Sequence, residues 1–165
     1  MRALFLLALM LAVGCAPSSA TSCTSEPCIC ASHESCDFTE VCAGQRFCAF
    51  DCFDNASCSG TCGDRCHALC GASCAFTSGA FSVVSCTYST SCVMIVGPHS
   101  QVGCEEASCR FSVGAETFVA CGRNARCEVA CAGPCQVSCA GATACNVSCS
   151  GGAVPSSSGD NITCG

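Results

Sequence analysis

The stretch CEVACAGPCQVSCAGATACNVSC, residues 127–149, carries cysteines at spacings of four and six residues. Two of its segments, CEVAC (127–131) and CQVSC (135–139), share the form cysteine–x–valine–x–cysteine. In a β-strand, residues i, i+2 and i+4 lie on the same face. Each segment therefore predicts a strand with two cysteines and a valine pointing inward. The intervening Ala-Gly-Pro, residues 132–134, is typical of a turn.

The same pattern recurs upstream with a period of about eighteen residues. Four consecutive rows of 18, 17, 18 and 18 residues begin at Cys74, Cys92, Cys109 and Cys127. In every row, positions one and thirteen are cysteine, position three is a large apolar residue and position eleven is valine. The apolar columns hold Phe76, Met94, Phe111 and Val129, and Val84, Val102, Val119 and Val137. A shorter row from Cys58 and a ragged one from Cys145 extend the repeat.

Two half-units per row, separated by glycine and proline turns, predict a chain that winds strand–turn–strand–turn. A long α-helix would also give this period, but Pro98, Pro134 and the abundant Gly, Ser, Thr and Val disfavour it. We therefore expect an all-β fold, a disulfide-stapled parallel β-solenoid with about 18 residues and two short strands per coil. The coil plan is similar to the β-roll of RTX proteins, whose Gly-Gly-x-Gly-x-Asp calcium turns are absent here. We expect the solenoid repeats over 58–165, after an irregular cysteine-rich entry segment over 23–57.

Cysteine makes up 25 of 165 residues, a level that marks a disulfide scaffold in an exported chain. Positions five and nine are both cysteine in the same two rows, so we expect them to pair across the coil, and position one to pair with position thirteen. The expected pairs are Cys58–Cys70, Cys62–Cys66, Cys74–Cys86, Cys92–Cys104, Cys109–Cys121, Cys127–Cys139 and Cys131–Cys135. Outside the regular rows we expect Cys36–Cys52, Cys42–Cys48 and Cys145–Cys164. A competing scheme joins neighbouring coils, for example Cys109 to Cys127, because stacked strands lie about 4.8 Å apart.

The N-terminus predicts export. Residues 1–14 contain one arginine and the run ALFLLALMLAV, which is too short to span a bilayer and typical of a signal peptide. Leu11–Cys15, LAVGC, resembles a bacterial lipobox, which implies lipidation of Cys15 and a tether over 15–22. An ordinary cleavage after Ser18-Ser19-Ala20 is the alternative. Both remove Cys15 from the pairing pool and leave an even number of cysteines, enough for about twelve disulfides.

Composition and spacing argue against several kinds of site. Six arginines, no lysine and a net charge of −6 do not form the basic footprint of a nucleic-acid-binding protein. Redox catalysis is disfavoured because no Cys-x-x-Cys occurs. Cysteines four apart on a strand lie about 13 Å apart, too far to share a metal ion. We expect His33, His67 and His99 to be solvated surface residues, and we expect neither a catalytic residue nor a cofactor.

We therefore expect an exported, lipid-anchored and non-enzymatic structural or interaction module of the bacterial cell envelope. It would lie at the outer membrane, facing the periplasm or the cell surface, with secretion as the alternative. Its partners would be the membrane, through the lipid, and a protein or glycan of the envelope or the extracellular space. The alternative function is a surface adhesin or ligand-binding protein, with Val93 and Ile95 on one sheet and Phe118 on the other as candidate contacts. Metal binding and ice binding are less favoured, the latter because the outward residues form no Thr-x-Thr ladder like that of insect antifreeze solenoids.

Overall fold

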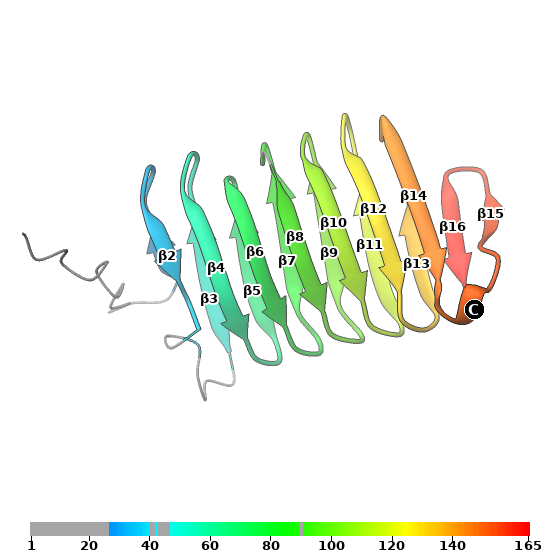
Figure 1. The fold of residues 1–165 in the computed structure, drawn as a ribbon, viewed down its shortest axis with the longest axis horizontal. Helices are drawn as coiled ribbons and strands as arrows, with labels where there is room; N and C mark the ends of the chain where they lie inside the picture. The colour runs from blue at the N-terminus through cyan, green and yellow to red at the C-terminus, as the bar shows by residue number, and fades with distance from the viewer. Residues whose placement is uncertain (1–26, 40–41, 43–46, 90) are drawn as a thin grey trace, which may run out of the picture.

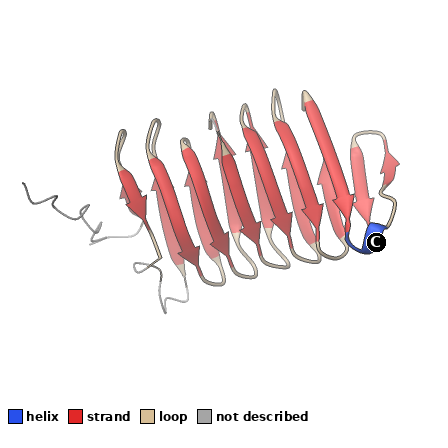
Figure 2. Cartoon of the chain, viewed as in Figure 1, coloured by secondary structure: helices blue, strands red, loops and turns tan. Residues whose placement is uncertain are grey.

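The computed structural model describes residues 27–39, 42, 47–89 and 91–165, and in it the chain winds into a solenoid of stacked coils (Figure 1). Strands account for nearly all of the regular structure in these residues, next to a single short helical turn, η1 (Ser150–Gly152) (Figure 2). The prediction of an all-β, two-sheeted parallel solenoid is confirmed. Within the described ranges, no helix is both long and apolar enough to cross a lipid bilayer.

Successive strands alternate between two sheets. The nine-stranded sheet has the order β1-β3-β5-β7-β9-β11-β13-β16-β15, and the seven-stranded sheet has the order β14-β12-β10-β8-β6-β4-β2. The strands of the nine-stranded sheet are β1 (Cys28–Cys30), β3 (Cys48–Cys52), β5 (Cys66–Cys70), β7 (Val83–Thr87), β9 (Gln101–Glu105), β11 (Thr117–Cys121), β13 (Cys135–Ser138), β15 (Ser156–Ser158) and β16 (Asn161–Cys164). Those of the seven-stranded sheet are β2 (Ser35–Asp37), β4 (Ser57–Cys62), β6 (Ser73–Ser78), β8 (Cys92–Val96), β10 (Ser108–Val113), β12 (Arg126–Cys131) and β14 (Ala144–Cys149).

The register of the sheets follows the columns of the repeat. Phe111 on β10 pairs with Met94 on β8 and with Val129 on β12, and the valines of position eleven align in the same way on the other sheet. All residues of the two apolar columns are buried, whereas the residues between them, such as Glu128, face solvent. The period-two alternation therefore correctly predicts which residues form the core.

The core is one side chain deep on each sheet and changes in character along the axis. Near the N-terminal end, the rings of Phe38 and Phe50 stack with centroids 4.3 Å apart, and Phe50 meets Phe76 edge-on at 5.1 Å. Beyond Phe76 the interior consists mainly of valine and cystine, with Met94 and Phe111 as its largest side chains. A core this thin leaves much of the stabilisation to the disulfides.

The solenoid extends further toward the N-terminus than the sequence predicts. Strands β1, β2 and β3 lie within the expected irregular segment and continue both sheets, with Cys48 paired in register with Cys66 and Cys36 with Cys58. Cys36 and Cys58 are 22 residues apart, a longer coil than those downstream, and this hides the period in the sequence. The expected signal peptide and tether fall outside the described residues.

The C-terminal end is closed on one sheet only. After β14 the chain turns back, and β16 pairs antiparallel with β13 while β15 forms the outer strand. Cys145, Val147 and Cys149 of β14 are only partly buried, unlike the same columns of the preceding coil. The antiparallel β15–β16 hairpin therefore ends the nine-stranded sheet, and β14 forms the edge of the other.

The turns that lead from the seven-stranded sheet to the nine-stranded sheet stack tightly, and we call this side of the solenoid the glycine edge. Its turns contain Gly79, Gly97 and Gly114 at equivalent positions. A Cβ atom added to Gly114 would lie 2.5 Å from the backbone nitrogen of Pro98, well inside van der Waals contact. Hydrogen bonds from Gly97 N to Ser78 O (3.0 Å) and from Gly114 N to Val96 O (2.8 Å) join these turns.

Candidate functional site

The most extensive chemical feature of the fold is its disulfide framework, which forms two columns. One column follows the turns that lead from the nine-stranded sheet to the next strand of the seven-stranded sheet, a side that we call the cysteine edge. It contains Cys30–Cys36, Cys52–Cys58, Cys70–Cys74, Cys86–Cys92, Cys104–Cys109, Cys121–Cys127 and Cys139–Cys145. The glycine edge carries Cys42–Cys48, Cys62–Cys66, Cys131–Cys135 and Cys149–Cys164.

Three of the pairs expected from the sequence are present and seven are wrong. Those present are Cys42–Cys48, Cys62–Cys66 and Cys131–Cys135. The wrong ones are Cys36–Cys52, Cys58–Cys70, Cys74–Cys86, Cys92–Cys104, Cys109–Cys121, Cys127–Cys139 and Cys145–Cys164, each of whose cysteines has another partner. The competing Cys109–Cys127 link between coils is also wrong, since these residues bond Cys104 and Cys121.

The error has a geometric cause. A strand that ends in a position-thirteen cysteine continues through a short turn to the position-one cysteine of the next coil, on the opposite sheet. Cys121 and Cys127 thus face each other across the interior, with their Cα atoms 6.3 Å apart. The inner pair Cys131–Cys135 closes a turn in the same way, at 6.1 Å. Every described staple of the regular coils therefore closes a turn, and none spans a whole coil.

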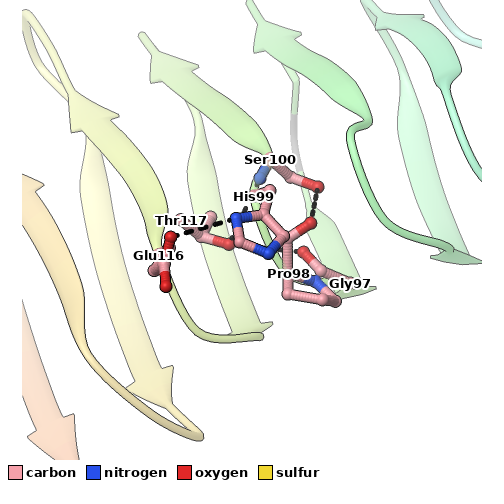
Figure 3. Close-up of polar contacts among 6 residues, drawn as sticks. All are labelled: Gly97, Pro98, His99, Ser100, Glu116 and Thr117. Carbon is pink, nitrogen blue, oxygen red and sulfur yellow. Dashed lines mark hydrogen bonds and ion pairs between the residues drawn. The ribbon is translucent and has the colours of Figure 1, made fainter.

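A gap in the column of the glycine edge is filled by hydroxyl groups. In the three central coils, position nine is Ser82, Ser100 and Thr117 instead of cysteine. Cys66 N donates to Ser82 Oγ (3.2 Å), Ser82 N to Ser100 Oγ (3.0 Å) and Ser100 N to Thr117 Oγ1 (3.5 Å). Ser100 Oγ in turn donates to Pro98 O at 3.2 Å, as Figure 3 shows. We call this chain the hydroxyl ladder, and it links neighbouring coils without a covalent bond.

The sequence analysis missed the hydroxyl ladder, although the signal was present. Position nine is a small hydroxyl residue in all three rows that lack cysteine there. Each of these side chains is buried, at 0% exposure for Ser82, so its oxygen needs a partner within the fold. Ser78, at position five, is buried as well, but its Oγ makes no hydrogen bond within the described part of the chain.

The two buried serines of one coil provide a test of the hydroxyl ladder. Ser82→Ala is expected to lower the free energy of unfolding by about 1–3 kcal/mol, because the buried Cys66 N–H loses its acceptor and Gly79 O loses its donor. Ser78→Ala removes only an unpaired hydroxyl and is expected to be neutral or stabilising. Chemical denaturation of the oxidised variants measures both values. Equal destabilisation by the two substitutions would contradict the assignment.

Groups of three cysteine sulfurs lie close enough together to resemble metal sites. The Sγ atoms of Cys70, Cys86 and Cys92, for example, lie within 4.8 Å of one another. Each of these sulfurs belongs to a disulfide, and a disulfide sulfur carries no thiolate with which to bind a metal. The groups arise because disulfides of adjacent coils stack along both edges of the solenoid.

The outward candidates lie on opposite faces of the solenoid. Val93 and Ile95 on β8 are 46% and 58% exposed on the seven-stranded sheet, and Phe118 on β11 is 43% exposed on the nine-stranded sheet. Phe118 lies in a surface groove of about 350 Å³, with Gln136 beside it in register. The other lining residues are Glu116, Thr117, Pro134, Cys135, Thr163 and Cys164. This groove combines an aromatic ring, an amide, a hydroxyl and a carboxylate.

The three histidines are exposed, as predicted. His99 lies at the tip of a turn on the glycine edge, where its Nδ1 lies 3.2 Å from Glu116 Oε2 (Figure 3). The ring of His99 also stacks on Phe81, with the ring centroids 5.1 Å apart. The guanidinium of Arg65 similarly lies 5.5 Å from the centroid of the Phe47 ring. These contacts join side chains of adjacent turns.

Some of the other charged groups form ion pairs at the surface. Arg110 bonds Glu128 on the neighbouring strand (2.8 Å), and Arg123 lies 2.8 Å from Glu106. Near the N-terminal end, the backbone N–H of Thr39 donates to Asp37 Oδ1 at 2.9 Å, and together with the Thr39 hydroxyl it holds the pKa of that carboxyl below its ordinary value. Exposed pairs of this kind contribute little to stability.

The chain matches no protein-family model, no curated protein and no solved structure.

Proposed function

We propose that the protein is an exported, non-enzymatic structural or interaction module of the bacterial cell envelope, held at the outer membrane by a lipid on Cys15. The observation that carries the proposal is the unbroken column of seven disulfides along the cysteine edge. Disulfides at this density form and persist in an oxidising compartment and not in the cytosol. The resemblance of Leu11–Cys15 to a lipobox supports the anchor.

A scaffold role agrees with the way the chain uses its reactive residues. Every cysteine within the described ranges belongs to a disulfide, and most of these cysteines are buried. The exposed His99 and Glu116 contact each other at the tips of adjacent turns. A stapled solenoid offers two extended faces and a stable spacing, which suit a spacer or a binding platform in the envelope.

Intact mass measurement of the native, full-length precursor after export tests this proposal. Lipoprotein processing is expected to give a chain that begins at Cys15, carries added acyl mass and fractionates with membranes. Cys15→Ser is the control and should lose both the acyl mass and the membrane association. A mature chain that begins at Thr21, without acyl mass, would contradict the anchor and favour secretion. The same spectrum, compared before and after reduction, reports the number of disulfides.

The groove around Phe118 favours a second candidate function, a surface adhesin or ligand-binding protein. An aromatic ring stacks on the apolar face of a sugar, and the side chains of Gln136 and Thr163 can bond its hydroxyl groups. Titration with soluble peptidoglycan fragments, followed by calorimetry, tests this role. Phe118→Ser should abolish binding, and Phe53→Ser, at a similarly exposed ring elsewhere, should not. Equal binding by both variants would contradict the assignment of the groove.

A further inference from the structure

The disulfides follow a simple order along the chain. Each of the eleven whose two ends are described joins a cysteine to the next cysteine in the sequence. Ten of these pairs are separated by only four to six residues, and the last, Cys149–Cys164, by 15. No described pair encloses or crosses another, so each can form without waiting for any cysteine further downstream.

The folded geometry alone does not enforce this order. Cys70 Sγ bonds Cys74 but also lies within 4.8 Å of both sulfurs of the next disulfide on the cysteine edge, Cys86–Cys92, so wrong partners lie close to the right one. Loop length discriminates weakly as well. Closing a loop of twelve residues instead of six is disfavoured only about threefold. A fully reduced chain released at once would therefore reach many competing pairings.

Order of emergence removes this ambiguity. When the chain enters an oxidising compartment from its N-terminus, each new cysteine finds one unpaired cysteine, which is the one just before it. Once a pair has formed, it closes the turn that positions the next strand on the coil already built. Growth by one coil at a time suits a solenoid, because each coil contacts only its neighbours.

We propose that the protein is a substrate of an export-compartment thiol oxidase that pairs its cysteines in order of emergence, and that it needs no disulfide isomerase. In each cycle a thiolate of the chain attacks the oxidase disulfide and forms a mixed disulfide. The next cysteine, as thiolate, attacks the chain sulfur of that bond and releases the oxidase as a dithiol. Overall, two thiols of the chain are oxidised to a disulfide, and two electrons and two protons pass to the oxidase, whose disulfide is reduced to the dithiol. This inference requires export but is independent of lipidation at Cys15.

The test expresses the full chain, with its own signal sequence, in a bacterial host and in derivatives that lack either the periplasmic thiol oxidase or the periplasmic isomerase. The fraction with native pairing is measured by peptide mapping without reduction. Loss of the isomerase is expected to leave this fraction unchanged, and loss of the oxidase is expected to reduce it severalfold. A severalfold loss without the isomerase would overturn the proposal.

Three variants separate order of emergence from simple folding stability. Ser78→Cys adds one cysteine between Cys74 and Cys86 and shifts every later pairing by one, which should make native pairing depend on the isomerase. Ser78→Cys/Ser82→Cys adds a further consecutive pair, at the positions that match Cys62–Cys66, and should restore independence. Gly165→Cys adds an odd cysteine after the last pair and should have no effect.

The comparison between the two single-cysteine variants is decisive. Both carry one extra thiol, but only the one at position 78 emerges before its competitors. If Ser78→Cys and Gly165→Cys respond equally to loss of the isomerase, order of emergence does not set the pairing and the proposal fails. Because lipidation plays no part in the readout, failure here leaves the proposed envelope function untouched, and a secreted, unlipidated product leaves this proposal untouched.

Discussion

Full reduction of the disulfides is expected to unfold the solenoid under conditions in which the oxidised protein stays folded. A disulfide that closes a turn of four to six residues contributes on the order of 2 kcal/mol in the chain-entropy model. The summed contribution of the eleven described disulfides to the free energy of unfolding therefore exceeds the roughly 5–15 kcal/mol by which folded domains are usually stable. The interior cannot compensate, because each regular strand buries little more than one large apolar side chain between its cysteines.

Far-ultraviolet circular dichroism and limited proteolysis, with and without a thiol reductant, measure this effect. Thiol titration confirms that reduction is complete, and the same buffer without reductant is the control. The strand signal and the resistance to protease are expected to disappear together. A fully reduced protein that keeps both would mean that the apolar columns and the hydroxyl ladder hold the coils without covalent help.

Among glycine-to-alanine substitutions on the glycine edge, Gly97→Ala is expected to lower the stability of the protein the most. The new Cβ would lie 2.6 Å from the backbone nitrogen of Ala80 and closer still to the carbonyl carbon of Gly79. These are backbone atoms of the adjacent turn, so no side chain can rotate away. The turns must separate, and this weakens the hydrogen bond from Gly97 N to Ser78 O. We expect a loss of about 3 kcal/mol in unfolding free energy.

Gly103→Ala is the matched control for this substitution. Gly103 lies on β9 of the adjacent half-coil, and its added Cβ would meet Ser85 Oγ at 3.7 Å, an ordinary van der Waals contact. Its effect is expected to stay within about 0.5 kcal/mol. Chemical denaturation of both variants with the disulfides intact measures the difference. Similar stabilities would mean that the glycine turns tolerate separation and that tight stacking is not required.

Much of the fold is legible in the sequence because its signals are local. The alternation in CEVAC and CQVSC correctly assigns Val129 and Val137 to the interior and Glu128 and Gln136 to solvent. The same alternation assigns Val93, Ile95 and Phe118 to the outer faces, where the structure places them. The groove beside Phe118 could not be foreseen, because it depends on Thr163, which a chain reversal brings next to Gln136.

The sequence does not determine which cysteines of the two invariant columns, positions one and thirteen, bond each other. Positions five and nine of the repeat are both cysteine in the same two rows, and this co-occurrence identifies the pairs Cys62–Cys66 and Cys131–Cys135. Position one and position thirteen are cysteine in every regular row, so no difference between rows can say whether Cys127 bonds Cys121 before it or Cys139 after it. Both partners lie on the same edge of the solenoid, about one coil apart.

By itself, the sequence determines the all-β solenoid, its period, its inward columns and the participation of its cysteines in staples, since these follow from residue spacing along a single strand. The tertiary structure decides which cysteines are partners, how the hydroxyl ladder fills the gap on the glycine edge and how the chain ends are built. The physical reason is the path of the turns. The side chains of a strand alternate between its two faces whatever follows the strand. The partner of Cys121, in contrast, depends on the short turn that places the Cα atom of Cys127 6.3 Å from its own.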